Sequence, residues 1–259
     1  MWLAVTVGLV AVGCGSNGSK AQSKKIFTRS NYAVLVSSPK DYEGASVRFV
    51  GKVFRVERDE KGTYLQVWAD PKNSEWNTIV AISDPSLEVA EDDFVRVVGT
   101  VTGEYKGENA LGAELTLPEV LASSITKTDA LAAASPAQTA LGRASWSRDG
   151  ITITIQKVEF ASDETRVFVA VVNNSSAPFS FYGSSANAIS GGRQIESTFS
   201  PDGYPELASD LEPGAHTSGV VVFPKIDPAL PLKIICEGSS DNMNIGDYGS
   251  VKAAFNWSN

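Results

Sequence analysis

Residues 47–53 read VRFVGKV and residues 95–101 read VRVVGTV, so the two stretches differ at only two positions. In both, apolar side chains recur with the period of two that is typical of a β-strand. Each stretch also has a glycine near its end, where a strand can bend sharply because no side chain obstructs it. We therefore expect two related, strongly coiled strands.

Three further strand-like runs accompany this pair, GTYLQVWA at 62–69, NTIVAIS at 77–83 and LGAELTLP at 111–118. Five short strands of this kind predict a small Greek-key barrel. After Val53 the alternation slips by one residue, and Phe54 and Val56 are expected to continue the apolar side. Such a slip indicates a β-bulge. Before the barrel, Ser30 is expected to cap a short helix that Pro39 ends.

Residues 30–127 resemble a known family. The runs DYEGASVRFVGKV, YLQVWA and DDFVRVVGTVTGEYKGENALGAELTL are similar to the tRNA-anticodon-binding-like OB-fold domains found in bacterial lipoproteins. The resemblance implies a five-stranded OB-fold barrel. It does not imply that this chain binds tRNA.

The remainder of the chain is again rich in strand patterns, with ITITIQKVEF, RVFVAVVNNSS, LEPGAHTSGVVVFP and LKIICEG separated by turn-forming residues. At least six strands with such turns predict a β-sandwich. These runs are similar to the immunoglobulin-like, telokin-like extracellular domains of unknown function in Gram-positive lipoproteins. That resemblance implies a surface module without a known catalytic site.

The N-terminus points to the cell envelope. An apolar run from Trp2 to Val12 is too short to span a membrane as a helix but fits the core of a secretory signal. The approach of Ala11, Val12 and Gly13 into Cys14 resembles the lipobox of bacterial lipoproteins, in which the cysteine is lipidated and becomes the first mature residue. One departure is that no Lys or Arg precedes the apolar run.

The same region contains GCGSNG, Gly13 to Gly18, which fits the G-x-G-x-x-G pattern of dinucleotide-binding turns. That motif needs a strand before it and a helix after it. Here a polar stretch without helical periodicity follows, so we expect no cofactor. The sequence predicts an all-β chain in five parts: a signal peptide at 1–13, a flexible tether at 14–27, an OB-fold domain at 28–127, a linker at 128–141 and an immunoglobulin-like β-sandwich at 142–259.

No catalytic constellation is evident in the sequence. His216 is the chain's one histidine, and no G-x-S-x-G elbow accompanies it. One histidine and one remaining cysteine do not form a four-ligand zinc site, so we expect no metal. Cys236 falls on the apolar face of its strand with Leu232 and Ile234, which favours a buried, inert thiol. We therefore expect no enzyme activity.

The candidate ligand-binding residues are Tyr64, Gln66 and Trp68, which alternate with Leu65 and Val67 along one strand. OB-folds bind oligonucleotides or oligosaccharides near this region, and aromatic side chains stack on such ligands. The alternative is that these aromatic residues only pack on neighbouring structure. The formal net charge of −8 argues against nucleic acid as a partner.

Together these features predict a lipid-anchored protein on the extracytoplasmic face of the membrane, with a non-catalytic binding role and an unknown extracellular ligand or protein partner. Two alternatives remain open, an OB-fold binder of oligonucleotides or oligosaccharides at the cell surface and an uncharacterised extracellular hydrolase.

Overall fold

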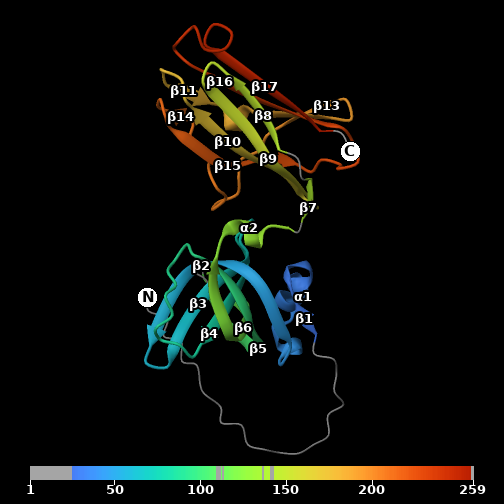
Figure 1. Ribbon diagram of the computed structural model, residues 1–259. Helices are drawn as coiled ribbons and strands as arrows, with labels where there is room; N and C mark the ends of the chain where they lie inside the picture. Colours follow the sequence, from blue (N-terminus) through green and yellow to red (C-terminus); the bar gives the residue numbers. More distant parts are fainter. Residues whose placement is uncertain (1–24, 109–111, 113, 136, 141–142, 258–259) are drawn as a thin grey trace, which may run out of the picture.

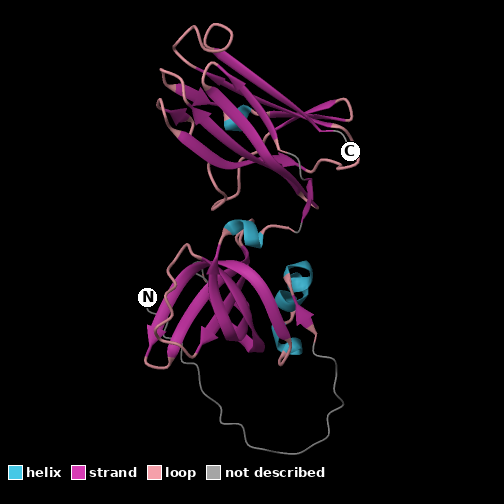
Figure 2. Ribbon diagram, in the orientation of Figure 1, coloured by secondary structure: helices cyan, strands magenta, loops and turns pink. Residues whose placement is uncertain are grey.

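The computed structural model describes residues 25–108, 112, 114–135, 137–140 and 143–257. The chain is all-β, as predicted, and consists of a barrel followed by a two-sheet sandwich (Figures 1 and 2). Cys14, together with the predicted signal peptide and most of the predicted tether, lies outside the described residues. Within them no helix is both long enough and apolar enough to cross a membrane.

The described residues of the N-terminal half form one sheet and four short helical segments. Its elements are β1 (Ile26–Phe27), η1 (Arg29–Asn31), α1 (Tyr32–Ser37), η2 (Pro39–Tyr42), β2 (Ser46–Asp59), β3 (Gly62–Asp70), β4 (Glu75–Ile82), β5 (Phe94–Glu108), β6 (Glu114–Thr128) and α2 (Ala130–Ala133). The sheet runs in the order β1-β2-β3-β4-β6-β5, and a further β2–β5 pairing closes β2 to β6 into a barrel.

The two similar heptads form that closing pair. β2 and β5 are antiparallel, with Val47 opposite Gly99 and Gly51 opposite Val95. Each glycine lies directly against the next strand. A Cβ on Gly51 would come within 2.5 Å of the Trp68 carbonyl oxygen. The internal similarity of the sequence therefore reflects two strands that pair with each other and share one steric requirement.

Two local expectations need correction. The short helix α1 ends at Ser37, before Pro39 as predicted, but Asn31 occupies its N-cap position because Ser30 belongs to η1. Strand β6 continues past Pro118 to Thr128. Proline, which has no N–H to donate, is tolerated there because the ladder between β5 and β6 is already irregular between Val101 and Gly103.

The end of the predicted tether is part of the barrel sheet. Ile26 and Phe27 pair in parallel with the start of β2, and Phe27 is fully buried. The ring of Phe27 packs edge-on against Tyr42, with 4.8 Å between ring centroids.

The C-terminal half forms two sheets. Its elements are β7 (Ala137–Ala140), β8 (Ala144–Arg148), β9 (Ile151–Ala161), β10 (Glu164–Asn173), β11 (Phe179–Phe181), η3 (Gly183–Ser185), β12 (Asn187–Ser190), β13 (Arg193–Glu196), β14 (Asp210–Leu211), β15 (His216–Pro224), β16 (Leu232–Ser239) and β17 (Ser250–Trp257). One sheet has the order β15-β10-β9-β7 with β8 also on β9, and the other has the order β13-β12-β16-β11-β14 with β17 also on β16.

The apolar faces of these two sheets pack on each other. Strand β10 alternates between two environments: Val167, Val169 and Val171 are buried in the sandwich core, whereas Phe168 points to the opposite face. Cys236 is buried in the same core with Leu232 and Ile234, as predicted. The segment 128–141, predicted as a linker, contains α2 and β7, and β7 pairs with β9.

Candidate functional site

The predicted ligand-binding residues lie on the outer face of β3. Leu65 and Val67 are buried inside the barrel, and Tyr64, Gln66 and Trp68 alternate with them as partly exposed side chains. The structure therefore brings the three residues onto one face. Because the strand has a period of two, this arrangement follows directly from the sequence pattern.

Phe54 joins this face and stacks on Trp68. The ring centroids are 4.1 Å apart and the planes are inclined by 20°. Phe54 was expected to continue the apolar inner side of β2, and this expectation is wrong. The predicted bulge is present between Val53 and Arg55, and it places the Phe54 ring beside Trp68 on the outside, while Val56 packs against the barrel core.

The outer face combines aromatic and polar groups. The Tyr64 hydroxyl donates a long hydrogen bond of 3.4 Å to the Asp59 carboxylate, and Gln66 adds an amide that can both donate and accept. A stacked aromatic pair beside such groups can pack against the flat surface of a sugar or base. We name these residues, Phe54, Tyr64, Gln66 and Trp68, the β3 face.

His216 was considered from the sequence as a catalytic base. His216 is exposed at the start of β15. Among the described residues there is no group of three or more His, Cys, Asp or Glu side chains placed to hold a metal ion. The thiol of Cys236 is also unavailable, because burial raises its pKa to about 12.

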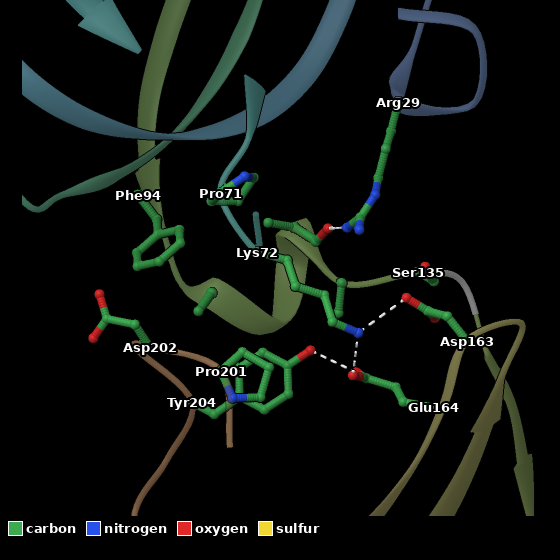
Figure 3. A pocket seen from close by; sticks show the side chains of 13 residues that line it. Arg29, Pro71, Lys72, Phe94, Ser135, Asp163, Glu164, Pro201, Asp202 and Tyr204 are labelled. Atoms are coloured by element: carbon green, nitrogen blue, oxygen red, sulfur yellow. Dashed lines mark hydrogen bonds and ion pairs between the residues drawn. The ribbon is translucent and has the colours of Figure 1, made fainter. Parts of the chain in front are cut away.

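A cluster of charged and polar side chains lies between the barrel and the sandwich (Figure 3). Lys72, in the turn after β3, reaches across to two carboxylates at the start of β10. Its Nζ is 2.8 Å from Glu164 and 3.1 Å from Asp163. Sequence reasoning missed this cluster, because nothing in the separate stretches indicates that they meet.

Glu164 is the centre of the cluster. Its side chain is only 4% exposed, and it accepts a 2.7 Å hydrogen bond from the Tyr204 hydroxyl. Arg166 lies 3.5 Å from the same carboxylate and 3.0 Å from Glu159. A buried carboxylate needs such partners, because burial of an unpaired charge is costly. Burial and the neighbouring Glu164 raise the pKa of Tyr204 well above its usual value.

An apolar contact and a further ion pair accompany this charged cluster. Phe94 of the barrel and Ala130 of α2 pack in one cluster with Tyr204, Val220 and Val222 of the sandwich. Beside them, Lys52 of the barrel pairs with Asp202 of the sandwich.

The crevice that remains in this contact has a volume of about 20 Å³, which is room for about one water molecule. Its charged side chains already have partners, because Lys72 pairs with Asp163 and Glu164, Arg29 pairs with Asp70, and Asp202 pairs with Lys52. We therefore interpret the crevice as a joint between the two halves rather than as a ligand pocket.

No family model and no curated protein matches this sequence. Solved structures that are similar to parts of it include the following three. The candidate lipoprotein ycdA of Bacillus subtilis shares 16% identity over 44% of this chain and 38% of its own, with a TM-score of 0.35. This chain thus spans 38% of the length of that protein.

A functionally unknown protein of Listeria monocytogenes shares 10% identity over 46% of this chain and 84% of its own, with a TM-score of 0.34. A conserved domain protein of Bacillus anthracis shares 7% identity over 83% of this chain and 76% of its own, with a TM-score of 0.35. At TM-scores this low the similarities carry no argument about function, which rests on the residues of this chain.

Proposed function

We propose that this chain is a non-catalytic binding protein of the cell envelope, anchored through a lipid on Cys14, and that the β3 face is its ligand-binding surface. The stack of Phe54 on Trp68 carries the proposal. This aromatic pair lies on the outside of the barrel and is partly open to solvent, while the interior of the barrel is filled by buried side chains. A ligand that stacks on aromatic rings needs a surface of this kind.

The anchor is supported by the sequence, in which an apolar run leads into Cys14. Its test is mass spectrometry of the N-terminal peptide from membranes of the native host. We expect Cys14 to be the first residue and to carry a diacylglyceryl group. An uncleaved, unmodified N-terminus in the soluble fraction would remove the anchor from the proposal and leave the β3 face to be tested separately.

An oligosaccharide fits the β3 face better than a nucleic acid does. Stacking on an aromatic ring serves both ligands, but a nucleic acid also needs cations that neutralise its phosphates. The chain has a net charge of −8, and Arg55, the exposed cation next to Phe54, is already paired with Glu57. A neutral sugar needs only stacking and hydrogen bonds, which Trp68 and Gln66 supply.

The β3 face is tested by calorimetric titration of the purified protein with soluble peptidoglycan fragments and with oligothymidylate. We expect saturable binding of the glycan and at least a roughly fivefold loss of affinity in Trp68→Ala, because stacking on an aromatic side chain contributes about 1 to 3 kcal/mol. The matched control is Tyr248→Ala, which removes an aromatic ring that is 85% exposed on the sandwich.

The alternatives have distinct signatures in this experiment. If the protein binds oligothymidylate and this binding weakens steeply with salt, the ligand is a nucleic acid rather than a glycan. Hydrolysis of the glycan, abolished in His216→Ala, would replace the binding role by an enzymatic one. Equal affinities for the wild type and Trp68→Ala would remove the β3 face as the site.

A further inference from the structure

The sandwich has a groove of about 320 Å³ on the side where β11, β14 and β15 lie next to one another (Figure 1). Its walls come from β11, η3, β15 and the segment 198–209, which crosses between the two sheets. The lining residues are Phe181, Gly183, Ser184, Thr198, Phe199, Ser200, Glu206, Leu207, Ser209, Val220 and Val221.

Backbone contacts hold the crossing segment in place, so the groove is preformed. The Thr198 N–H donates to the Val222 carbonyl at 2.7 Å, and the Val220 N–H donates to the Pro205 carbonyl at 2.9 Å. These bonds also occupy the outer edge of β15. An extended peptide therefore cannot add to the sheet at this edge, and the groove has to be filled by side-chain-sized groups.

The groove is apolar at its base. Phe181 and Val221 belong to the buried sandwich core, and Leu207 packs against that core. Gly183 borders the hollow, and a Cβ there would contact the side chains of Phe181 at 3.3 Å and Leu207 at 3.5 Å. A volume of this size lies at the lower end of the range for small-molecule sites, which are lined mainly by apolar side chains.

Phe199 stands at the rim with 96% of its surface exposed. Exposure of a large aromatic side chain costs hydrophobic free energy that burial would recover. An apolar ligand in the groove would cover the ring and recover that energy. The exposed ring and the adjacent hollow together indicate a site for an apolar group.

The charge of the groove determines which head group an apolar ligand can carry. Among the described residues that line it, Glu206 alone has an ionisable side chain, and it has no hydrogen-bond or ion-pair partner within the described part of the chain. The rest of the polar rim consists of serine and threonine hydroxyls. A ligand with a positive head would pair with Glu206, whereas a negative head would be repelled.

We propose that this groove binds a small cationic amphiphile, an apolar chain or ring that carries an amine. The apolar part lies on Phe181 and Leu207, Phe199 covers it, and the amine contacts Glu206. The site is separate from the β3 face, so it does not depend on the function proposed for the barrel.

The experiment compares two probes that share a chain and differ in the charge of the head, octylammonium and octyl sulfate, each below its micelle concentration. Binding to the full chain is followed by calorimetry. We expect octylammonium to bind with roughly three- to fivefold higher affinity than octyl sulfate, which is the size of an exposed charge pair. This preference should vanish in Glu206→Gln.

Two further variants locate the site. Ser184→Trp places a ring in the hollow from an exposed position on η3 and should abolish binding of both probes. Tyr248→Ala, the matched control on the β16–β17 loop, should leave binding unchanged. Circular dichroism of each variant confirms that the sandwich is folded before affinities are compared.

Three outcomes would overturn the proposal. The first is the absence of saturable octylammonium binding, and the second is binding that persists in Ser184→Trp. The third is a preference for octylammonium that is absent in the wild type or that persists in Glu206→Gln. If the soluble probes fail and the protein instead shows Phe199-dependent binding to phosphatidylcholine vesicles, the exposed ring is a membrane contact rather than the cover of a small-molecule site.

Discussion

The hydroxyl of Tyr204 donates a 2.7 Å hydrogen bond to the carboxylate of Glu164. Both residues belong to the sandwich, yet their partner is Lys72 of the barrel, whose ammonium group lies 2.8 Å from the same carboxylate. The buried carboxylate therefore receives donors from both halves of the chain. Glu164 thus links the charged side chains of the barrel to those of the sandwich.

Replacement of this carboxylate should destabilise the protein strongly. We expect Glu164→Gln to lower the free energy of unfolding by about 3 kcal/mol, because loss of one member of a buried ion cluster leaves its partners uncompensated. Arg166 retains Glu159 at 3.0 Å, which places the loss at the lower end of the range for buried pairs. Urea titration followed by circular dichroism measures the change.

The neighbouring Asp163→Asn is the control for this prediction. Its carboxylate contacts the same Lys72 at 3.1 Å, but the side chain is 39% exposed, and solvent screens the pair. We expect its effect to stay within about 1 kcal/mol. Equal effects of the two substitutions would contradict the assignment of Glu164 as the centre of the joint.

Tyr204→Phe isolates the hydrogen bond from the packing of the ring. The loss of a donor to a charged, buried acceptor should cost about 1.5 to 3 kcal/mol at neutral pH. The native pKa of Tyr204 is raised, so its contribution is complete below the unfolded value near 10 and declines as pH rises above it. Stability measured between pH 8 and 11 should therefore fall more steeply in the wild type than in Tyr204→Phe.

The second ion pair across the joint makes a prediction at acid pH. Hydrogen bonding and attraction from Lys52 lower the pKa of Asp202. A depressed carboxyl pKa contributes stability above the unfolded value near 4, and this contribution is lost as pH falls through the native value. The effect is small, up to about 1 kcal/mol, because Asp202 is largely exposed.

The measurement for this pair is the difference in urea midpoint between the wild type and Lys52→Met. We expect the difference to shrink when the pH is lowered from 6 to 3. A difference that stays constant over that interval would show that Lys52 acts through packing rather than through its charge. Lys127→Met, which disrupts a pair with Asp93 within the barrel, provides a comparison away from the joint.

The sequence contained enough information for the barrel and for the outer face of β3. The period of two in GTYLQVWA already places Leu65 and Val67 on one face of the strand and Tyr64, Gln66 and Trp68 on the other. The shift by one residue in the alternation after Val53 predicts the bulge. The position of Phe54 could not be predicted, because a bulge allows the extra residue to face either side. The side on which the Phe54 ring lies depends on the neighbouring strand, where Trp68 provides an aromatic ring on which it stacks.

The joint and the sandwich groove were beyond sequence reasoning for a different reason. Lys72 and Glu164 are 92 positions apart, and each stretch alone reads as a solvated turn. One feature of the sequence does indicate a contact here. The run RVFVAVVNN is apolar on both faces, and on its second face Phe168 packs in the apolar cluster at the joint. The crossing segment 198–209 has no periodicity from which its course could be inferred.

The buried thiol gives a chemical prediction. Burial raises the pKa of Cys236 to about 12, so almost no thiolate forms near neutrality and reagents cannot reach the sulfur. In Cys14→Ser protein we expect no reaction with a disulfide reagent at pH 8 until the chain is unfolded in guanidinium. Rapid labelling of the native protein would indicate that β16 opens locally.

The closing pair of the barrel makes the sharpest steric prediction. At an unstrained, open position Gly→Ala stabilises a protein by about 0.4 to 1 kcal/mol, because the unfolded chain loses freedom. At Gly99, however, the new Cβ would lie 2.6 Å from the Leu121 carbonyl oxygen, a backbone atom that cannot rotate away. Gly99→Ala should therefore destabilise the barrel, by about 2 to 3 kcal/mol, because strands β5 and β6 must separate.

The same sign is expected for Gly51→Ala, whose Cβ would meet the Trp68 carbonyl oxygen at 2.5 Å. Thr100→Ala, at the exposed position next to Gly99, is the control and should change the unfolding free energy by less than about 0.5 kcal/mol. The sign separates the two explanations for these glycines. Stabilisation by either alanine would mean that the glycine is not required by the close approach of the strands, and that the similarity of the two heptads has another cause.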